Sequence, residues 1–150
     1  NNEIDISYSP VKEFENKYEY PLTFQIFMEE IGEFEISQIY NGVLLRIEKP
    51  FNPLNDHSGG FLIQGEFTEI FNQRDNIFLK NVNIVAQDYD GYFYGFTKIK
   101  DSKQFIFICE DSEILKGHDF FKWILTYIFE NLENIDFKDY KHFFNRLLQN

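Results

Sequence analysis

The sequence predicts an α+β domain in which helices cover one face of an antiparallel sheet. Apolar residues recur at helical spacing in the first and last parts of the chain, and they alternate with polar residues in between. The alternating segments are joined mostly by short turns, which is typical of antiparallel strands. We therefore expect a single domain over residues 1–150, with about five to six strands, two N-terminal helices and two C-terminal helices.

Two short helices are expected before the first strand. The first begins at Ser9 and Pro10, because a hydroxyl can cap the first turn and proline lacks an N–H group that this turn does not need. Its apolar residues continue at helical spacing to Tyr18. The second begins at Pro21 and ends before Gly32, a residue suited to a helix C-terminus. The apolar stripe of this second helix consists of Phe24, Phe27, Met28 and Ile31.

The central part of the chain has the alternating pattern of strands. Strands are expected at residues 33–36, 42–49, 61–67, 81–86, 92–99 and 104–109. A helix through residues 68–71 is the alternative to the strand at 61–67. Two prolines and two glycines make residues 49–60 the one long loop between these segments.

Residues 85–96, VAQDYDGYFYGF, could form either a metal-binding loop or a hairpin turn. A calcium loop with Gly91 at its sixth position would place Ala86 at the first position and Thr97 at the twelfth. Neither residue can supply the carboxylate that calcium needs there. Asp90 followed by glycine between alternating apolar runs instead favours a hairpin turn, because glycine tolerates a positive φ.

Two helices are expected after the last strand, beginning at the caps Asp119 and Asp136. Apolar residues form one stripe in each. The first stripe consists of Phe121, Ile124, Leu125, Ile128 and Leu132, widened by Phe120, Trp123 and Tyr127. The second consists of Tyr140, Phe143, Phe144, Leu147 and Leu148.

Charge and composition limit the partners that the protein can bind. The net charge is −11, from 14 basic and 25 acidic residues. Because nucleic acids and anionic membranes are bound by cationic surfaces, we expect neither as a partner. A basic protein partner suits this charge, and an ordinary solvated acidic surface is the alternative. The sequence has no long uncharged apolar stretch and no signal-peptide pattern, so we expect a cytoplasmic protein.

The sequence contains no recognisable catalytic or cofactor-binding motif, so we expect neither enzyme activity nor a cofactor. Asp56, His57 and Ser58 are adjacent, and neighbours in one loop cannot adopt the geometry of a catalytic triad. Cys109, the single cysteine, lies in an apolar strand and is expected to be a buried structural residue. Acidic residues cluster between Glu29 and Glu35, where a solvated or cation-attracting surface is expected and a metal site is the weaker alternative.

Four segments follow one another along the chain: Phe14–Tyr20 leading into Pro21, PLTFQIFMEEIG closed by Gly32, NVNIVAQDYDGYFYGF around Gly91, and the Phe-rich HDFFKWILTYIF. In this order they resemble the SUKH superfamily, which includes fungal cell-wall-assembly regulators and bacterial immunity proteins that neutralise toxins. Tyr20 stands where the family usually has leucine. The resemblance implies an α+β binding module with no catalytic residues, whose members in toxin systems bind their toxins directly.

We therefore expect a non-catalytic immunity protein that binds a basic toxin domain through an acidic surface. A regulatory or scaffold module of the same fold is the alternative, and a small metal-dependent hydrolase is a third hypothesis. The residues predicted to contact the partner are Glu29, Glu30, Glu33, Glu35, Asp88, Tyr89, Asp90 and Tyr92.

Overall fold

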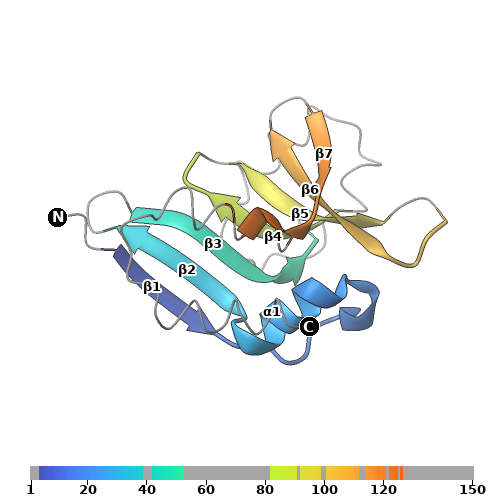
Figure 1. Cartoon of the computed structure of the whole chain (residues 1–150), viewed down its shortest axis with the longest axis horizontal. Coiled ribbons are helices and arrows are strands. Elements are labelled where there is room, and N and C mark those ends of the chain that lie inside the picture. Colours follow the sequence, from blue (N-terminus) through green and yellow to red (C-terminus); the bar gives the residue numbers. More distant parts are fainter. Residues whose placement is uncertain are drawn as a thin grey trace.

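The described part of the chain forms one antiparallel sheet with helical segments on one of its faces (Figure 1). The computed structural model describes residues 4–38, 42–52, 82–90, 92–98, 101–111, 114–120, 122–124 and 126. The strands are β1 (Ile4–Ser9), β2 (Glu33–Gln38), β3 (Gly42–Phe51), β4 (Val82–Asp88), β5 (Phe93–Lys98), β6 (Phe105–Asp111) and β7 (Ile114–His118). The helical segments before β2 are the 3-10 helix η1 (Lys17–Glu19) and the α-helix α1 (Leu22–Glu30).

The strands follow one another across the sheet in the order of the sequence. Each of the seven described strands pairs antiparallel with its successor, from β1 at one edge to β7 at the other (Figure 1). The predicted antiparallel arrangement is therefore confirmed, as are the strands predicted at 33–36, 42–49, 81–86, 92–99 and 104–109. The segments 61–67 and 68–71 lie outside the described residues. The predicted number of strands was too low, because β1 and β7 were not anticipated.

The helix predicted to begin at Ser9 and Pro10 is wrong. Ser9 is the last residue of β1, and residues 10–14 are irregular until the short turn η1. Val11 and Phe14 still pack against the core, and the Val11 N–H group donates to the Met28 carbonyl at 2.8 Å. Contacts with the end of α1 thus account for the apolar spacing here, and tertiary packing overrides a short helical pattern.

The helix α1 has the bounds and the apolar stripe that the sequence predicts. Phe24, Phe27 and Met28 are fully buried on its inner side. At its C-terminus the N–H groups of Ile31 and Gly32 both donate to the Phe27 carbonyl, at 2.8 and 2.9 Å. Gly32 has a φ of 79°, the left-handed conformation expected of a residue that ends a helix.

The chain turns helical again after β7, as predicted. The Asp119 carboxylate accepts a hydrogen bond from the Lys122 N–H group at 2.9 Å, which confirms the predicted cap. Phe120 and Ile124 are buried in the core, and Trp123 packs beside them. The rest of this helix and the helix predicted from Asp136 lie outside the described residues, so the predicted pair of C-terminal helices stays a prediction.

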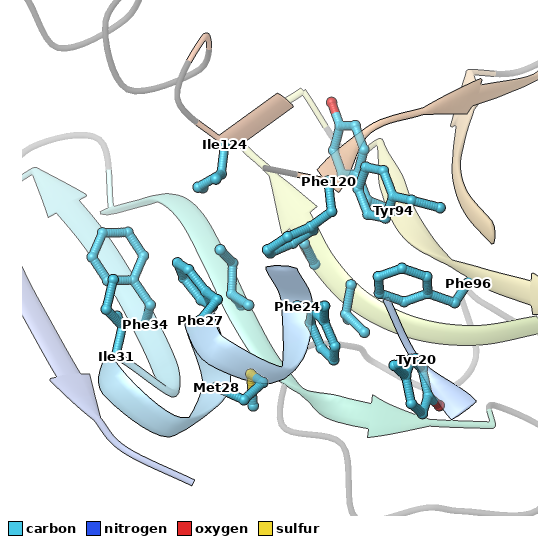
Figure 2. Close-up of a cluster of buried hydrophobic side chains, with 14 of the residues drawn as sticks. Tyr20, Phe24, Phe27, Met28, Ile31, Phe34, Tyr94, Phe96, Phe120 and Ile124 are labelled. Carbon is cyan, nitrogen blue, oxygen red and sulfur yellow. The ribbon is translucent and has the colours of Figure 1, made fainter. Parts of the chain in front are cut away.

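An aromatic core fills the space between α1 and the sheet (Figure 2). The rings of Tyr20 and Phe105 stack with centroids 4.3 Å apart. The ring centroid of Phe24 lies 4.7 Å from that of Phe96 in β5 and 5.0 Å from that of Phe120. The abundance of phenylalanine in the sequence therefore serves packing, since each of these rings removes a large apolar surface from water.

The two halves of the sheet differ on the face opposite α1. In β4, β5 and β6 this face also carries buried apolar residues, because Ile84, Phe93 and Ile108 are almost inaccessible to solvent. In β1 and β2, and around Arg46 and Glu48 of β3, the same face carries polar side chains that are exposed or half-buried. Phe51, at the end of β3 opposite Ile84, is buried. The prediction of a sheet covered on one face therefore holds only for β1, β2 and the part of β3 before Phe51.

Candidate functional site

An open groove of about 430 Å³ lies on the polar face of β1, β2 and β3. We call it the acidic groove, after the polar side chains Ser7, Ser9, Glu33, Glu35, Arg46 and Glu48 that line it. It contains three glutamates and one arginine. Its lining is net negative and suits a cationic ligand.

Strand alternation places these side chains. Phe34 and Ile36 point into the core, so Glu33 and Glu35 on the same strand point to the opposite face. The strand register then brings Ser7 of β1 and Arg46 of β3 directly opposite Glu35. Three consecutive strands thereby form one polar surface.

An ion pair joins β2 and β3 across the groove. An Arg46 guanidinium nitrogen lies 3.2 Å from a Glu35 carboxylate oxygen, and both side chains are about one-third exposed. Arg46 partly offsets the negative charge of Glu35, and with three glutamates against one arginine the lining of the groove remains net negative. Asp5, exposed on the same face of β1, extends the negative region toward the edge of the sheet.

The predicted cluster from Glu29 to Glu35 is divided by the fold. Glu33 and Glu35 line the acidic groove, whereas Glu29 and Glu30 lie on the last turn of α1. Glu29 is paired with Lys17, whose Nζ atom lies 2.6 Å from its carboxylate.

Lys17 is the one buried charged side chain in the part of the chain that the structure describes. Its hydrogen bond to Glu29 raises the pKa of the Lys17 ammonium group, and burial opposes this rise. The ammonium group also donates to the Lys12 carbonyl. Glu29 thus has a structural partner and helps to hold residues 12–17 against α1.

The carboxylates do not converge on one point. Within the described ranges, no group of three or more histidine, cysteine, aspartate or glutamate side chains is placed to hold a metal ion. Glu29 and Glu35 instead neutralise two separate cations, Lys17 and Arg46.

The hairpin at the end of β4 contains the other residues predicted to bind a partner. Asp88 accepts hydrogen bonds from the Tyr92 N–H group at 3.0 Å and from the Tyr94 hydroxyl at 2.6 Å. Tyr89 and Asp90 form the turn itself and are exposed, and β4 and β5 pair antiparallel on either side. The hairpin interpretation is therefore confirmed, although Gly91 lies outside the described residues.

The hairpin and the acidic groove lie at separate places on the sheet. The Tyr89 N–H group donates to the Leu44 carbonyl of β3 at 2.8 Å, so the turn is held at the beginning of that strand. The turn lies beside β3 on the side away from β2, because β4 and β2 flank β3. None of the described hairpin residues lines the groove. The predicted contact residues therefore occupy three places: the groove, the end of α1 and the hairpin.

The Asp88 carboxyl gives the hairpin a pH-dependent stability. Burial raises the pKa of this group above its ordinary value of 3.8, and the Tyr94 and Tyr92 hydrogen bonds oppose the rise. The folded protein thus binds this proton more tightly than the unfolded chain does. Its contribution to stability is greatest below pH 3.8 and falls as the pH rises through the folded-state pKa.

Substitution of Asp88 by asparagine removes this titration. We expect the free energy of unfolding of the wild type, relative to that of Asp88→Asn, to fall as the pH rises from about 3 to about 7. Urea unfolding of both proteins across this range measures the difference, and the other carboxylates cancel because both proteins share them. A constant difference, or one that grows with pH, would contradict the raised pKa.

A second cavity of about 480 Å³ lies near the end of β3. Tyr20, Asn52 and Asn83 line it, and the Asn83 amide donates to the Tyr20 hydroxyl at 2.9 Å. Burial raises the pKa of the Tyr20 phenol, and this hydrogen bond opposes the rise. The cavity thus contains a neutral tyrosine with a defined partner, which no pattern in the sequence indicated.

Comparison with known proteins adds no relative. No protein-family model, no curated protein and no solved structure matches the chain. In the described part of the chain, none of the helices has the length and apolar character needed to cross a membrane.

Proposed function

We propose that the protein is a non-catalytic binding module that neutralises a basic toxin domain through the acidic groove. The observation that carries this proposal is the placement of Glu33, Glu35 and Glu48 around one open groove with a single arginine. A surface of this kind attracts a cationic partner over long range and orients it on approach. The net charge of −11 strengthens the same field.

The resemblance to the SUKH superfamily supports the choice of a toxin as the partner. Members of that family in toxin systems act by direct binding and need no catalytic residues. A regulatory or scaffold module that binds a cellular protein is the second candidate, and the same groove would serve it. The neighbouring gene separates the two, since an immunity gene lies directly beside the gene of its toxin.

Co-expression with the toxin encoded by the adjacent gene tests the immunity function. We expect the protein to restore growth and to elute with the toxin as one complex from a sizing column. Continued killing without a complex would exclude the immunity function, as would an adjacent gene that encodes no toxin.

Two double substitutions test the groove within that complex. Glu33→Gln with Glu48→Gln removes two carboxylates from the groove, and we expect about five- to tenfold weaker binding and a smaller salt dependence. Glu15→Gln with Asp101→Asn is the matched control, because both residues are exposed outside the groove and the change in net charge is the same. Asn suits position 101, where φ is 66°. Equal weakening by both pairs would show that net charge, rather than the groove, binds the toxin.

A further inference from the structure

We propose that β1 is a docking strand, whose outer edge pairs with an extended, cation-bearing segment of the partner. The segment would become an additional strand of the sheet beside the acidic groove. This inference rests on the proposed function, because it names the chemistry of the partner segment. It also specifies an alternation of basic and apolar residues in the partner segment, which attraction between charges alone would not require.

β1 lies at one edge of the described sheet. It is the first strand in the sheet order, and no described strand pairs with its outer edge (Figure 1). Asp5, Ser7 and Ser9 are all exposed along it. An edge strand presents N–H and C=O groups that another extended chain can hydrogen bond, which is a common mode of peptide recognition.

The two faces of β1 differ in polarity. Asp5, Ser7 and Ser9 lie on the face of the acidic groove, opposite Ser37, Glu35 and Glu33 of β2. Ile6 and Tyr8 lie on the other face, where they pair with Ile36 and Phe34. Tyr8 is 41% exposed.

An added strand must match both faces. Its side chains alternate, so every second residue would lie beside the groove and its carboxylates. The residues in between would lie beside Ile6 and Tyr8. The partner segment is therefore a strand in which lysine or arginine alternates with apolar residues.

The opposite edge of the sheet is less suited to such a segment. β7 contains Lys116 and His118 and no acidic residue, so its composition does not complement a basic strand. β1 has an aspartate and no basic residue. Charge complementarity thus selects β1 between the two edges.

A synthetic peptide tests the inference directly. The probe is a capped peptide of about eight residues in which lysine and valine alternate. We expect it to bind, and to shift and protect the backbone amide signals of Ile4–Ser9 in NMR spectra and hydrogen exchange. Salt should weaken the binding, because the contacts between the charges are exposed to solvent.

Three matched peptides separate edge pairing from simple attraction. The first has prolines at its two central positions, which remove one N–H group from each edge, and the second groups its lysines and valines in separate blocks. The third replaces lysine by glutamate. Each is expected to bind at least tenfold more weakly than the alternating peptide. Equal binding of the proline or block peptide would overturn the inference, as would shifts confined to other strands.

A pair of protein variants locates the edge. Asp5→Lys reverses the charge on β1 and is expected to weaken the alternating peptide about tenfold. Glu15→Lys makes the same change in net charge at an exposed site away from β1 and should leave the affinity within about twofold.

The peptide experiment and the toxin experiment can fail independently. Rescue of growth without peptide binding rejects only the docking strand, and peptide binding without rescue rejects only the immunity function.

Discussion

Replacing Gly32 with alanine is expected to lower the free energy of unfolding by at least about 4 kcal/mol, or to prevent folding. The residue has a positive φ, which costs about 1–2 kcal/mol for a residue with a side chain. The larger effect comes from crowding. A Cβ atom at this position would lie 2.5 Å from the Pro10 Cα atom and closer still to the Ser9 carbonyl oxygen. These are backbone atoms, so the end of β1 would have to move away from α1 and β2.

Gly42→Ala is the matched control for this prediction. Gly42 also has a positive φ, of 74°, but a Cβ atom there would have no neighbour within 4 Å. We expect a loss of about 1 kcal/mol, from the backbone conformation alone. Urea unfolding of both variants measures the difference. Similar losses in the two proteins would mean that β1 and α1 are not packed together as described.

Replacing Phe24 with alanine is expected to cost about 3–5 kcal/mol. Phe24 is fully buried, and its ring contacts four other aromatic rings, of which Tyr20, Phe96 and Phe120 are labelled in Figure 2. Those partners are Phe14, Tyr20, Phe96 and Phe120, with centroids 4.7 to 5.8 Å away. The substitution leaves a cavity between α1 and β5 that neighbouring rings fill only in part, because aromatic side chains have few rotamers.

Leu22→Ala provides the control on the same helix. Leu22 is 61% exposed, so its truncation removes little buried surface and should change the free energy of unfolding by less than about 0.5 kcal/mol. The two variants change the same element by one apolar side chain each. A loss below about 1.5 kcal/mol for Phe24→Ala would show that the aromatic cluster is looser than described.

The fold was predictable where the local pattern and the tertiary contacts agree. The stripe of α1, the glycine that ends it and the alternation of the central strands all appear in the sequence as they do in the structure. The first predicted helix failed because Val11 and Phe14 pack against the core from an irregular segment, whereas Tyr18 is 81% exposed. The strand β1 was missed because its Ile-Asp-Ile alternation is short and its last residue, Ser9, resembles a helix cap.

The site was predictable only in part, because strand register is a tertiary property. Alternation in β2 correctly placed Glu33 and Glu35 on one face. Nothing local indicated that Arg46 would lie opposite Glu35, or that Glu48 and the serines of β1 would complete the groove. The bulge after Ile36 shifts the register of β2 against β3, and no sequence pattern predicted this bulge. The pairing of Glu29 with the buried Lys17 was likewise hidden.

The strictly sequential order of the strands also sets how the sheet resists mechanical force. β1 and β7 lie at opposite edges, so tension applied between them acts across the strands rather than along them. The hydrogen bonds between two neighbouring strands are then loaded one after another, and each breaks separately. A sheet in which first and last strands lay side by side would share the load among many bonds at once. This domain should therefore peel open at low force, edge strand first.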